Sequence, residues 1–179
     1  MKKTILILTV ALFSASMVLV SCSKDENETA GTSTLNVRLT DAPIPLDEVN
    51  IDIREVKVKF SDDSTSADGW FTLTTFPGIY NLLAYQNGVD TLLATGVFPA
   101  QVVKEIRFVL GPNSTVMDTM GVVHPLTVPS GSESGLKLKI NRALNATLVN
   151  IVIDFDAALS IHQTGNGDYM LKPVLRIMP

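Results

Sequence analysis

The chain has 179 residues, 14 of them basic and 18 acidic, and its formal net charge is −4. This length suits one domain with a hydrophobic core. The acidic balance provides no positive field to attract phosphates, so the composition argues against nucleic acid as a partner.

The first 21 residues predict a secretory signal. Met1-Lys2-Lys3 is positive, residues 5–20 are apolar apart from small hydroxyl side chains, and the run ends in Leu19-Val20-Ser21-Cys22. An apolar core of this length is typical of a signal peptide and is short for a membrane span. The ending resembles the lipobox of bacterial lipoproteins, which implies cleavage before Cys22 and acylation (palmitate or a similar chain) of its thiol and amine. The alternatives are an ordinary secretory signal with an incidental cysteine, or an uncleaved anchor.

The residues after Cys22 form a charged run, Ser23-Lys24-Asp25-Glu26-Asn27-Glu28. This run resembles the surface-export signal of lipoproteins in the Bacteroidota, which implies lipid anchoring in the outer membrane with display on the cell surface. A solvated tether on a periplasm-facing lipoprotein is the alternative, because charged polar runs stay disordered. We expect a signal peptide at 1–21, an acylated cysteine and flexible acidic tether at 22–33, and one folded domain at 34–179.

Period-two alternation of apolar and polar residues predicts strands through most of that domain. It begins at 34–40, and in residues 49–60 its phase slips at Arg54-Glu55, which predicts a β-bulge. Residues 70–76 form the next predicted strand, 79–84 a strand or single turn, and Asn87-Gly88 a tight turn.

The second half continues this pattern. We expect strands at 102–110, 136–140, 149–156 and 169–178, a hairpin around 118–121, and one helical turn at 157–161. Pro173 favours an edge or a bulge in the last strand. Because no segment keeps helical periodicity for three turns, the predicted fold is all-β: an antiparallel β-sandwich of about nine or ten short strands with little helix.

Several phrases occur in a recognisable order. They include Leu35-Asn36-Val37-Arg38-Leu39-Thr40-Asp41-Ala42-Pro43, Asn87-Gly88-Val89-Asp90-Thr91-Leu92, Ile106-Arg107-Phe108-Val109-Leu110-Gly111, Asp154-Phe155-Asp156-Ala157-Ala158 and Lys172-Pro173-Val174. From about Thr34 to Ile177 the chain resembles the bacterial domain-of-unknown-function family numbered 4382. The resemblance implies a secreted, β-rich domain and brings no catalytic residues with it.

No catalytic motif is found in the sequence. The two histidines, His124 and His162, lie outside any recognisable pattern, and no nucleophile elbow or phosphate-binding glycine loop is present. We therefore expect a non-enzyme without a cofactor, with a hydrolase as the remaining catalytic possibility.

Calcium is the metal that the sequence leaves open. Asp154 and Asp156 are two apart in a predicted strand, so we expect both on one face, where they repel unless a cation or donors intervene. Asp41 and the turn at 164–168 are further candidate oxygen donors. The alternative is that both aspartates cap turns or bind loop amides.

The sequence contains two further kinds of candidate site, for sugar binding and for O-glycosylation. Trp70 follows a turn and is a candidate for stacking on a sugar, with core packing as the alternative. Ser64, Thr91 and Thr119 lie in short Asp-Ser/Thr patterns that resemble the O-glycosylation acceptors of the Bacteroidota.

Together these features predict a cell-envelope lipoprotein whose domain binds a glycan or a protein. The alternative is a structural accessory subunit of an envelope complex with no small ligand.

Overall fold

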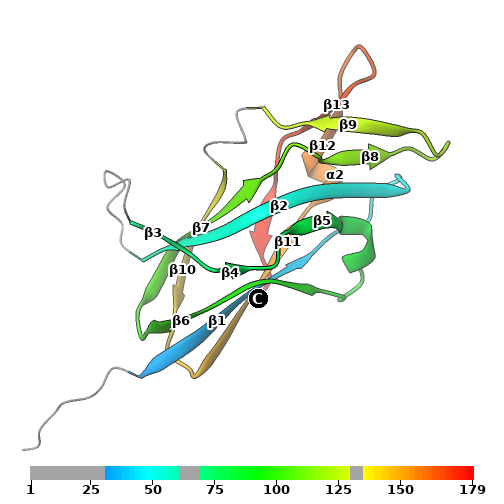
Figure 1. Cartoon of the computed structure of the whole chain (residues 1–179). Coiled ribbons are helices and arrows are strands. Elements are labelled where there is room, and N and C mark those ends of the chain that lie inside the picture. The colour runs from blue at the N-terminus through cyan, green and yellow to red at the C-terminus, as the bar shows by residue number, and fades with distance from the viewer. Residues whose placement is uncertain (1–30, 61–68, 130–134) are drawn as a thin grey trace, which may run out of the picture.

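The computed structural model describes residues 31–60, 69–129 and 135–179, and within them β-strand is the predominant secondary structure. Fourteen strands form a five-stranded and a nine-stranded sheet, which pack as the two layers of a sandwich (Figure 1). The prediction of an all-β sandwich with little helix is confirmed. Two strand pairs run parallel, so the sheets are mixed rather than wholly antiparallel as predicted, and the described residues form 14 strands rather than nine or ten.

The five-stranded sheet has the order β14-β11-β1-β6-β4. Its centre is β1 (Thr32–Thr40), between β11 (Leu148–Phe155), which is parallel to it, and β6 (Thr91–Pro99), which is antiparallel. The edges are β14 (Leu175–Ile177) and β4 (Thr74–Thr75). The parallel pair of β1 and β11 joins segments more than a hundred residues apart, so local sequence patterns could not predict it.

The nine-stranded sheet is built around the long strand β2 (Glu48–Lys59). On one side β2 pairs with β7 (Val102–Leu110) and β8 (Thr115–Met117), and on the other with β3 (Trp70–Thr72) and β5 (Gly78–Asn81). The pairing register of β2 shifts between Ile53 and Glu55, which confirms the predicted bulge. The sheet continues through β10 (Leu136–Ala143), β9 (Val123–Thr127), β13 (Tyr169–Leu171) and β12 (Ile161–Gln163).

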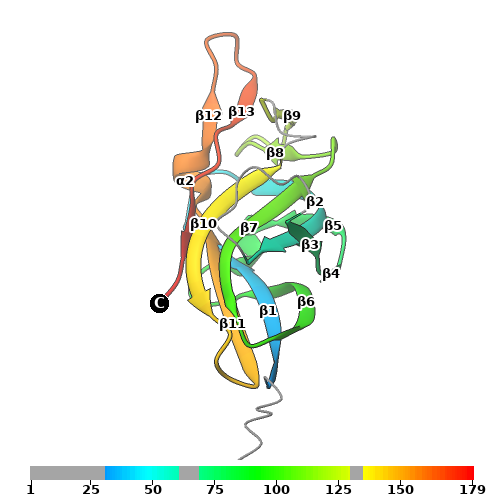
Figure 2. The same cartoon turned by 90° about the vertical axis from the view of Figure 1, so that its left-hand side faces the viewer.

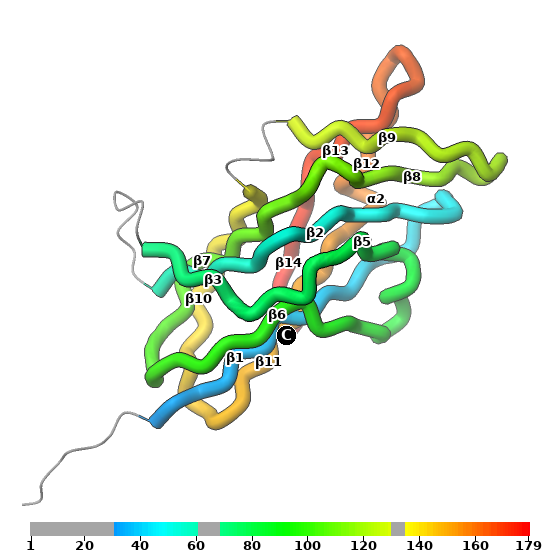
Figure 3. Tube along the Cα trace, viewed as in Figure 1, coloured from blue at the N-terminus to red at the C-terminus, as the bar shows by residue number. Residues whose placement is uncertain are grey.

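Two segments predicted as single strands cross from one sheet to the other. Residues 70–76 divide at Leu73 into β3 of the nine-stranded sheet and β4 of the five-stranded sheet. The last strand divides around Pro173 into β13 and β14, because proline has no N–H with which to continue a ladder. In Figure 3 the chain runs down from β13, near the top of the view, to β14, near its centre.

In the part of the chain that the structure describes, helix is limited to two single turns, η1 (Leu82–Tyr85) and α2 (Ala157–Ser160). Asn81 caps the first and Asp156 the second, since each side chain accepts a hydrogen bond from a first-turn N–H. No helix in the described ranges has the length and apolar character needed to cross a membrane.

The core lies between the sheets and follows the predicted alternation. Leu35, Val37 and Leu39 of β1 are fully buried, as are Ile51 of β2 and Ile153 of β11. The alternate residues of β1 and β11 face outward, and this places a row of polar side chains on the outer face of the five-stranded sheet. In that row Asn36 donates to Asn150 and accepts from Thr95.

Candidate functional site

A cavity of about 270 Å³ lies at the end of the five-stranded sheet where β1 and β11 finish. Parallel pairing sets Thr40 beside Asp154 at this end, and both side chains are buried. The cavity is lined by residues from these strands, from the segment before β6 and from the end of the chain: Thr40, Asp41, Ala42, Gly88, Asp90, Val152, Asp154 and Met178.

The segment before β6 is held over the sheet by a tight turn. Asn87 and Gly88 have φ values of 57° and 85°, and the Val89 N–H donates to the Gln86 carbonyl. Positive φ at both central residues is what a type I′ turn requires, so the predicted Asn-Gly turn is confirmed. The Thr40 hydroxyl fixes this segment to β1 through the carbonyls of Tyr85 and Val89.

Asp41 follows β1 and is buried in the wall of the cavity. Its Oδ1 accepts a hydrogen bond of 2.9 Å from the Ala157 N–H, and its Oδ2 a longer one of 3.4 Å from Gln86. Burial raises the pKa of the Asp41 carboxyl above its usual value of 3.8, these hydrogen bonds oppose the rise, and the negative charge of Asp154 adds to it.

Asp154 and Asp156 share one guanidinium. Asp154 is in β11 and Asp156 caps α2, and Nη2 of Arg176 on β14 contacts Oδ2 of both carboxylates. The sequence-based expectation that these two carboxylates need a cation or donors nearby therefore has a structural counterpart in Arg176. The capping alternative also describes Asp156, whose Oδ1 accepts from the Leu159 N–H.

The raised pKa of Asp41 predicts a pH effect on stability. Between pH 3.8 and the higher folded-state pKa, the folded protein binds more protons than the unfolded chain, so this group lowers stability as pH rises. Asp41→Asn is neutral throughout and keeps an acceptor for Ala157. We expect the variant to gain stability relative to the wild type as pH rises from 3 to 7, measured as urea midpoints. An unchanged difference across this range would contradict the assignment, and exposed Asp168→Asn is the control.

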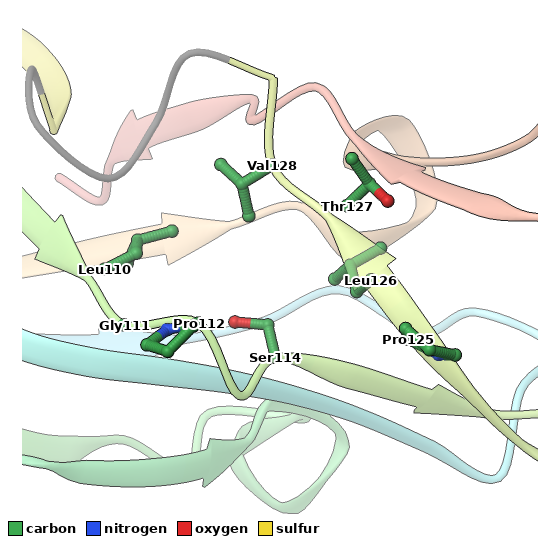
Figure 4. A pocket seen from close by; sticks show the side chains of 8 residues that line it. All are labelled: Leu110, Gly111, Pro112, Ser114, Pro125, Leu126, Thr127 and Val128. Carbon is green, nitrogen blue, oxygen red and sulfur yellow. The ribbon is translucent and has the colours of Figure 1, made fainter.

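Two other cavities carry no ionisable side chain in their lining. One, of about 260 Å³, lies between the end of β7 and β9, and the side chains of Leu110, Ser114 and Val128 point toward it (Figure 4). The other, of about 340 Å³, lies at the start of β1, beside Ser33. The cavity at Asp41 and Asp154 is therefore the best candidate site on chemical grounds.

The structure brings only some of the calcium candidates together. Asp41, Asp154 and Asp156 gather at one end of the sheet, whereas the turn at 164–168 joins β12 to β13 in the other sheet and projects away from α2 (Figure 2). Among the described residues, no three His, Cys, Asp or Glu side chains come together closely enough to hold a metal ion.

The other predicted positions are spread over the molecule. Trp70 lies at the start of β3, partly exposed, with the Arg107 guanidinium 4.0 Å from its ring centroid and so covering one ring face. Thr119 is exposed in the β8–β9 turn, and Thr91 is partly buried at the start of β6. Cys22 and Ser64 lie outside the described residues.

The sequence did not predict a partner for His124, but its side chain pairs with that of Asp118. Its Nε2 lies 2.9 Å from Asp118 Oδ2 across the β8–β9 hairpin, and its ring packs 5.0 Å from that of Tyr169. The His124 hydrogen bond, together with N–H groups of the turn, lowers the pKa of Asp118. His162 is exposed on β12.

These features define a two-sheet, all-β domain with an acidic cavity at one end of its smaller sheet. The chain belongs to the family described as "Domain of unknown function (DUF4382)", whose model matches residues 32–173. The predicted family is therefore confirmed, and the match ends before β14. No curated protein and no solved structure gave a match to the chain.

Proposed function

We propose that this chain is a cell-envelope lipoprotein whose β-sandwich is a non-catalytic binding module on the outer membrane. The observation that carries the proposal is Leu19-Val20-Ser21-Cys22 at the end of a short apolar run. Three acyl chains at roughly 0.8 kcal/mol per buried methylene hold a protein far more firmly than the marginal anchoring of one chain.

The arrangement of the domain supports this proposal. The first strand begins at Thr32, ten residues after the proposed acylation site. The acidic cavity lies at the opposite end of β1, and the β8–β9 and β12–β13 hairpins also lie away from the start of β1 (Figures 1 and 2). A domain tethered at Thr32 thus presents the cavity and these hairpins away from the membrane.

The anchor is tested by Cys22→Ala. We expect the wild-type chain to partition with the membrane fraction and to take up labelled palmitate, and the variant to take up none. Ser21→Ala, which keeps a small residue before the cysteine, is the matched control and is expected to behave as the wild type. Equal labelling of the Cys22→Ala chain would falsify the anchor.

Surface display is a separate part of the proposal and rests on the acidic run after Cys22. We expect the triple change Asp25→Asn, Glu26→Gln and Glu28→Gln to leave palmitate labelling intact and to reduce the labelling of intact cells by an impermeant amine reagent. Undiminished surface labelling would instead support the tether interpretation.

A second candidate function is a structural accessory subunit of an envelope complex. The observation that favours it is a set of large apolar side chains about half exposed along β3–β5, namely Phe71, Phe76 and Ile79. Crosslinking in the envelope followed by purification distinguishes the two. A stoichiometric protein partner that is lost on Phe76→Ser and Ile79→Ser would support the accessory role.

A further inference from the structure

A row of basic side chains crosses the outer face of the nine-stranded sheet. Antiparallel pairing sets Arg107 of β7 directly opposite Lys57 of β2 on one side and Lys137 of β10 on the other. The neighbours of Arg107 in β7, Ile106 and Phe108, are buried in the core, so the row faces outward. The strands β10, β7 and β2 lie side by side (Figure 2), and the basic side chains therefore leave the sheet at the strand spacing of about 4.8 Å.

The next row along the same face has alternating charges. There Glu105 of β7 lies between Lys59 of β2 and Lys139 of β10, so opposite charges face each other. Opposite charges in directly opposed positions stabilise a sheet, whereas like charges destabilise it. The row through Arg107 thus carries a repulsion that stability does not explain, and an anionic ligand bound along it would relieve that repulsion.

Arg107 lies at the centre of the row, and none of the described residues accepts a hydrogen bond from its guanidinium. The guanidinium is held 4.0 Å from the centroid of the Trp70 ring, in a contact that reaches over β2 from β3 to β7. Stacking fixes the plane of a guanidinium without using its N–H donors. Of its unpaired nitrogens only Nε is buried, so the terminal nitrogens are open to a ligand. A fixed and unpaired guanidinium is arranged for bidentate binding of an oxyanion.

The lysines beside Arg107 add positive charge to this surface. Lys137 is exposed, as is Lys139 two residues further along β10, and neither has a hydrogen-bond or ion-pair partner among the described residues. Lys57 is paired with Glu55 at 2.8 Å, and both of these side chains remain accessible to solvent. Positive charge therefore exceeds negative charge along the row, although the chain as a whole carries −4.

The shape of this surface favours an extended ligand. None of the cavities described above is lined by a residue of the row. A small free anion would have no walls around it here, because small ligands bind in concave sites. An extended chain could instead contact Lys57, Arg107 and Lys137 in turn.

Among extended anions, a polysaccharide fits this surface better than a peptide or a membrane. An acidic peptide would pair its backbone with a sheet edge. At Lys57 and Arg107, however, β2 and β7 are paired on both sides, so these residues are reached only through their side chains. A planar membrane would meet the whole face, including Glu55 and Glu105, whereas a single chain can follow the row. The net negative charge argues against nucleic acid.

We propose that the row formed by Lys57, Arg107 and Lys137 binds an acidic polysaccharide, whose carboxylate or sulfate groups pair with the guanidinium and the lysines. The inference rests on the proposed binding role of the domain and names its ligand class. Because these ionic contacts are open to water, binding weakens as salt is added.

The test is binding of the membrane-extracted protein, in detergent, to polysaccharides fixed on a biosensor surface. Dextran, carboxymethyl-dextran and dextran sulfate share one backbone and differ in charge. We expect salt-sensitive binding to the charged dextrans and none to dextran, and the charged dextran that binds more tightly identifies the acidic group. Poly-L-glutamate, oligodeoxythymidylate and mixed micelles containing phosphatidylglycerol serve as competitors. At equal anionic charge, each should displace the protein at least tenfold less effectively than the soluble charged dextran does.

Lys137→Glu reverses one exposed charge of the row and should weaken binding at least tenfold. The change also replaces a like-charge pair with Arg107 by an attractive pair, so the variant should melt no lower than the wild type. Arg107→Lys keeps the charge without the planar fork and should weaken binding several-fold. Lys172→Glu is the matched control, because it reverses an exposed lysine between β13 and β14, and it should bind as the wild type does.

The proposal is overturned if neither charged dextran binds, if dextran binds as tightly, or if a competitor displaces the protein as well as the charged dextran does. It is also overturned if Lys137→Glu binds undiminished or melts well below the wild type. Its failure is distinguishable from that of the proposed function. Palmitate labelling at Cys22 without polysaccharide binding removes only the ligand class, and the reverse result removes only the anchor.

Discussion

Arg176→Ala is expected to destabilise the folded domain by about 2–4 kcal/mol. The change leaves the carboxylates of Asp154 and Asp156 without a cation, and both are buried. Breaking a buried ion pair from one side costs about 3–5 kcal/mol, and we expect somewhat less because the Arg176 side chain is half exposed to water. The measurement is the urea midpoint at neutral pH.

Two comparisons make this result specific. Arg142→Ala removes an exposed arginine from β10 and should change stability by less than about 0.5 kcal/mol. Adding Asp154→Asn and Asp156→Asn to Arg176→Ala should recover much of the loss, since the unpaired charges are gone and asparagine still caps α2. Equal effects of Arg176→Ala and Arg142→Ala would show that Arg176 does not hold the carboxylates.

Gly111→Ala is expected to cost about 2–3 kcal/mol for a steric reason. A Cβ at this position would overlap Asp52 Oδ2 and lie 2.5 Å from both Asp52 Cγ and Arg54 Nε. Asp52 is fully buried and cannot retreat, because its Oδ2 accepts from the Asn113 N–H and its backbone bonds to Gly111 and Ser114. Overpacking of this kind typically costs about 1–3 kcal/mol.

Gly165→Ala is the matched control. No atom lies within 4 Å of a Cβ built at Gly165, so the same substitution there should be nearly neutral. Thermal unfolding of both variants provides the comparison. A Gly111→Ala protein that melts with the wild type would mean that the β7–β8 connection adapts without strain.

Local patterns predicted the elements of this fold better than their pairing. The bulge at Ile53 to Glu55, the Asn87-Gly88 turn and the helical turn after Asp156 each depend on a few adjacent residues. The divisions at Leu73 and Pro173 were missed because each half is a strand of only two or three residues, too short for its own pattern to set it apart. The two halves of each segment differ only in their pairing partners, which are strands of different sheets.

The candidate site shows the same limit. The sequence analysis identified Asp41, Asp154 and Asp156, because carboxylates at strand ends are candidate calcium ligands or capping groups. It did not predict that Asp41 reaches α2, which depends on the parallel pairing of β1 and β11. Arg176 was missed as well, because β13 and its hairpin in the other sheet separate β14 from β11 along the chain. A search of the sequence for a basic residue that could neutralise the two aspartates would have returned Arg176 only as one of several candidates.

The family match ends at Pro173. Beyond it, Met178 lines the cavity and Arg176 pairs with Asp154 in the cavity wall. The chemistry of the cavity in this chain therefore depends partly on a segment that the family model does not cover.

The proposed lipid anchor is tested most directly by the intact mass of the protein extracted from its membrane. We expect a chain that begins at Cys22 and is heavier than residues 22–179 by a diacylglyceryl group and one amide-linked acyl chain. A chain that retains Met1, or one cleaved near residue 22 without added acyl mass, would contradict it.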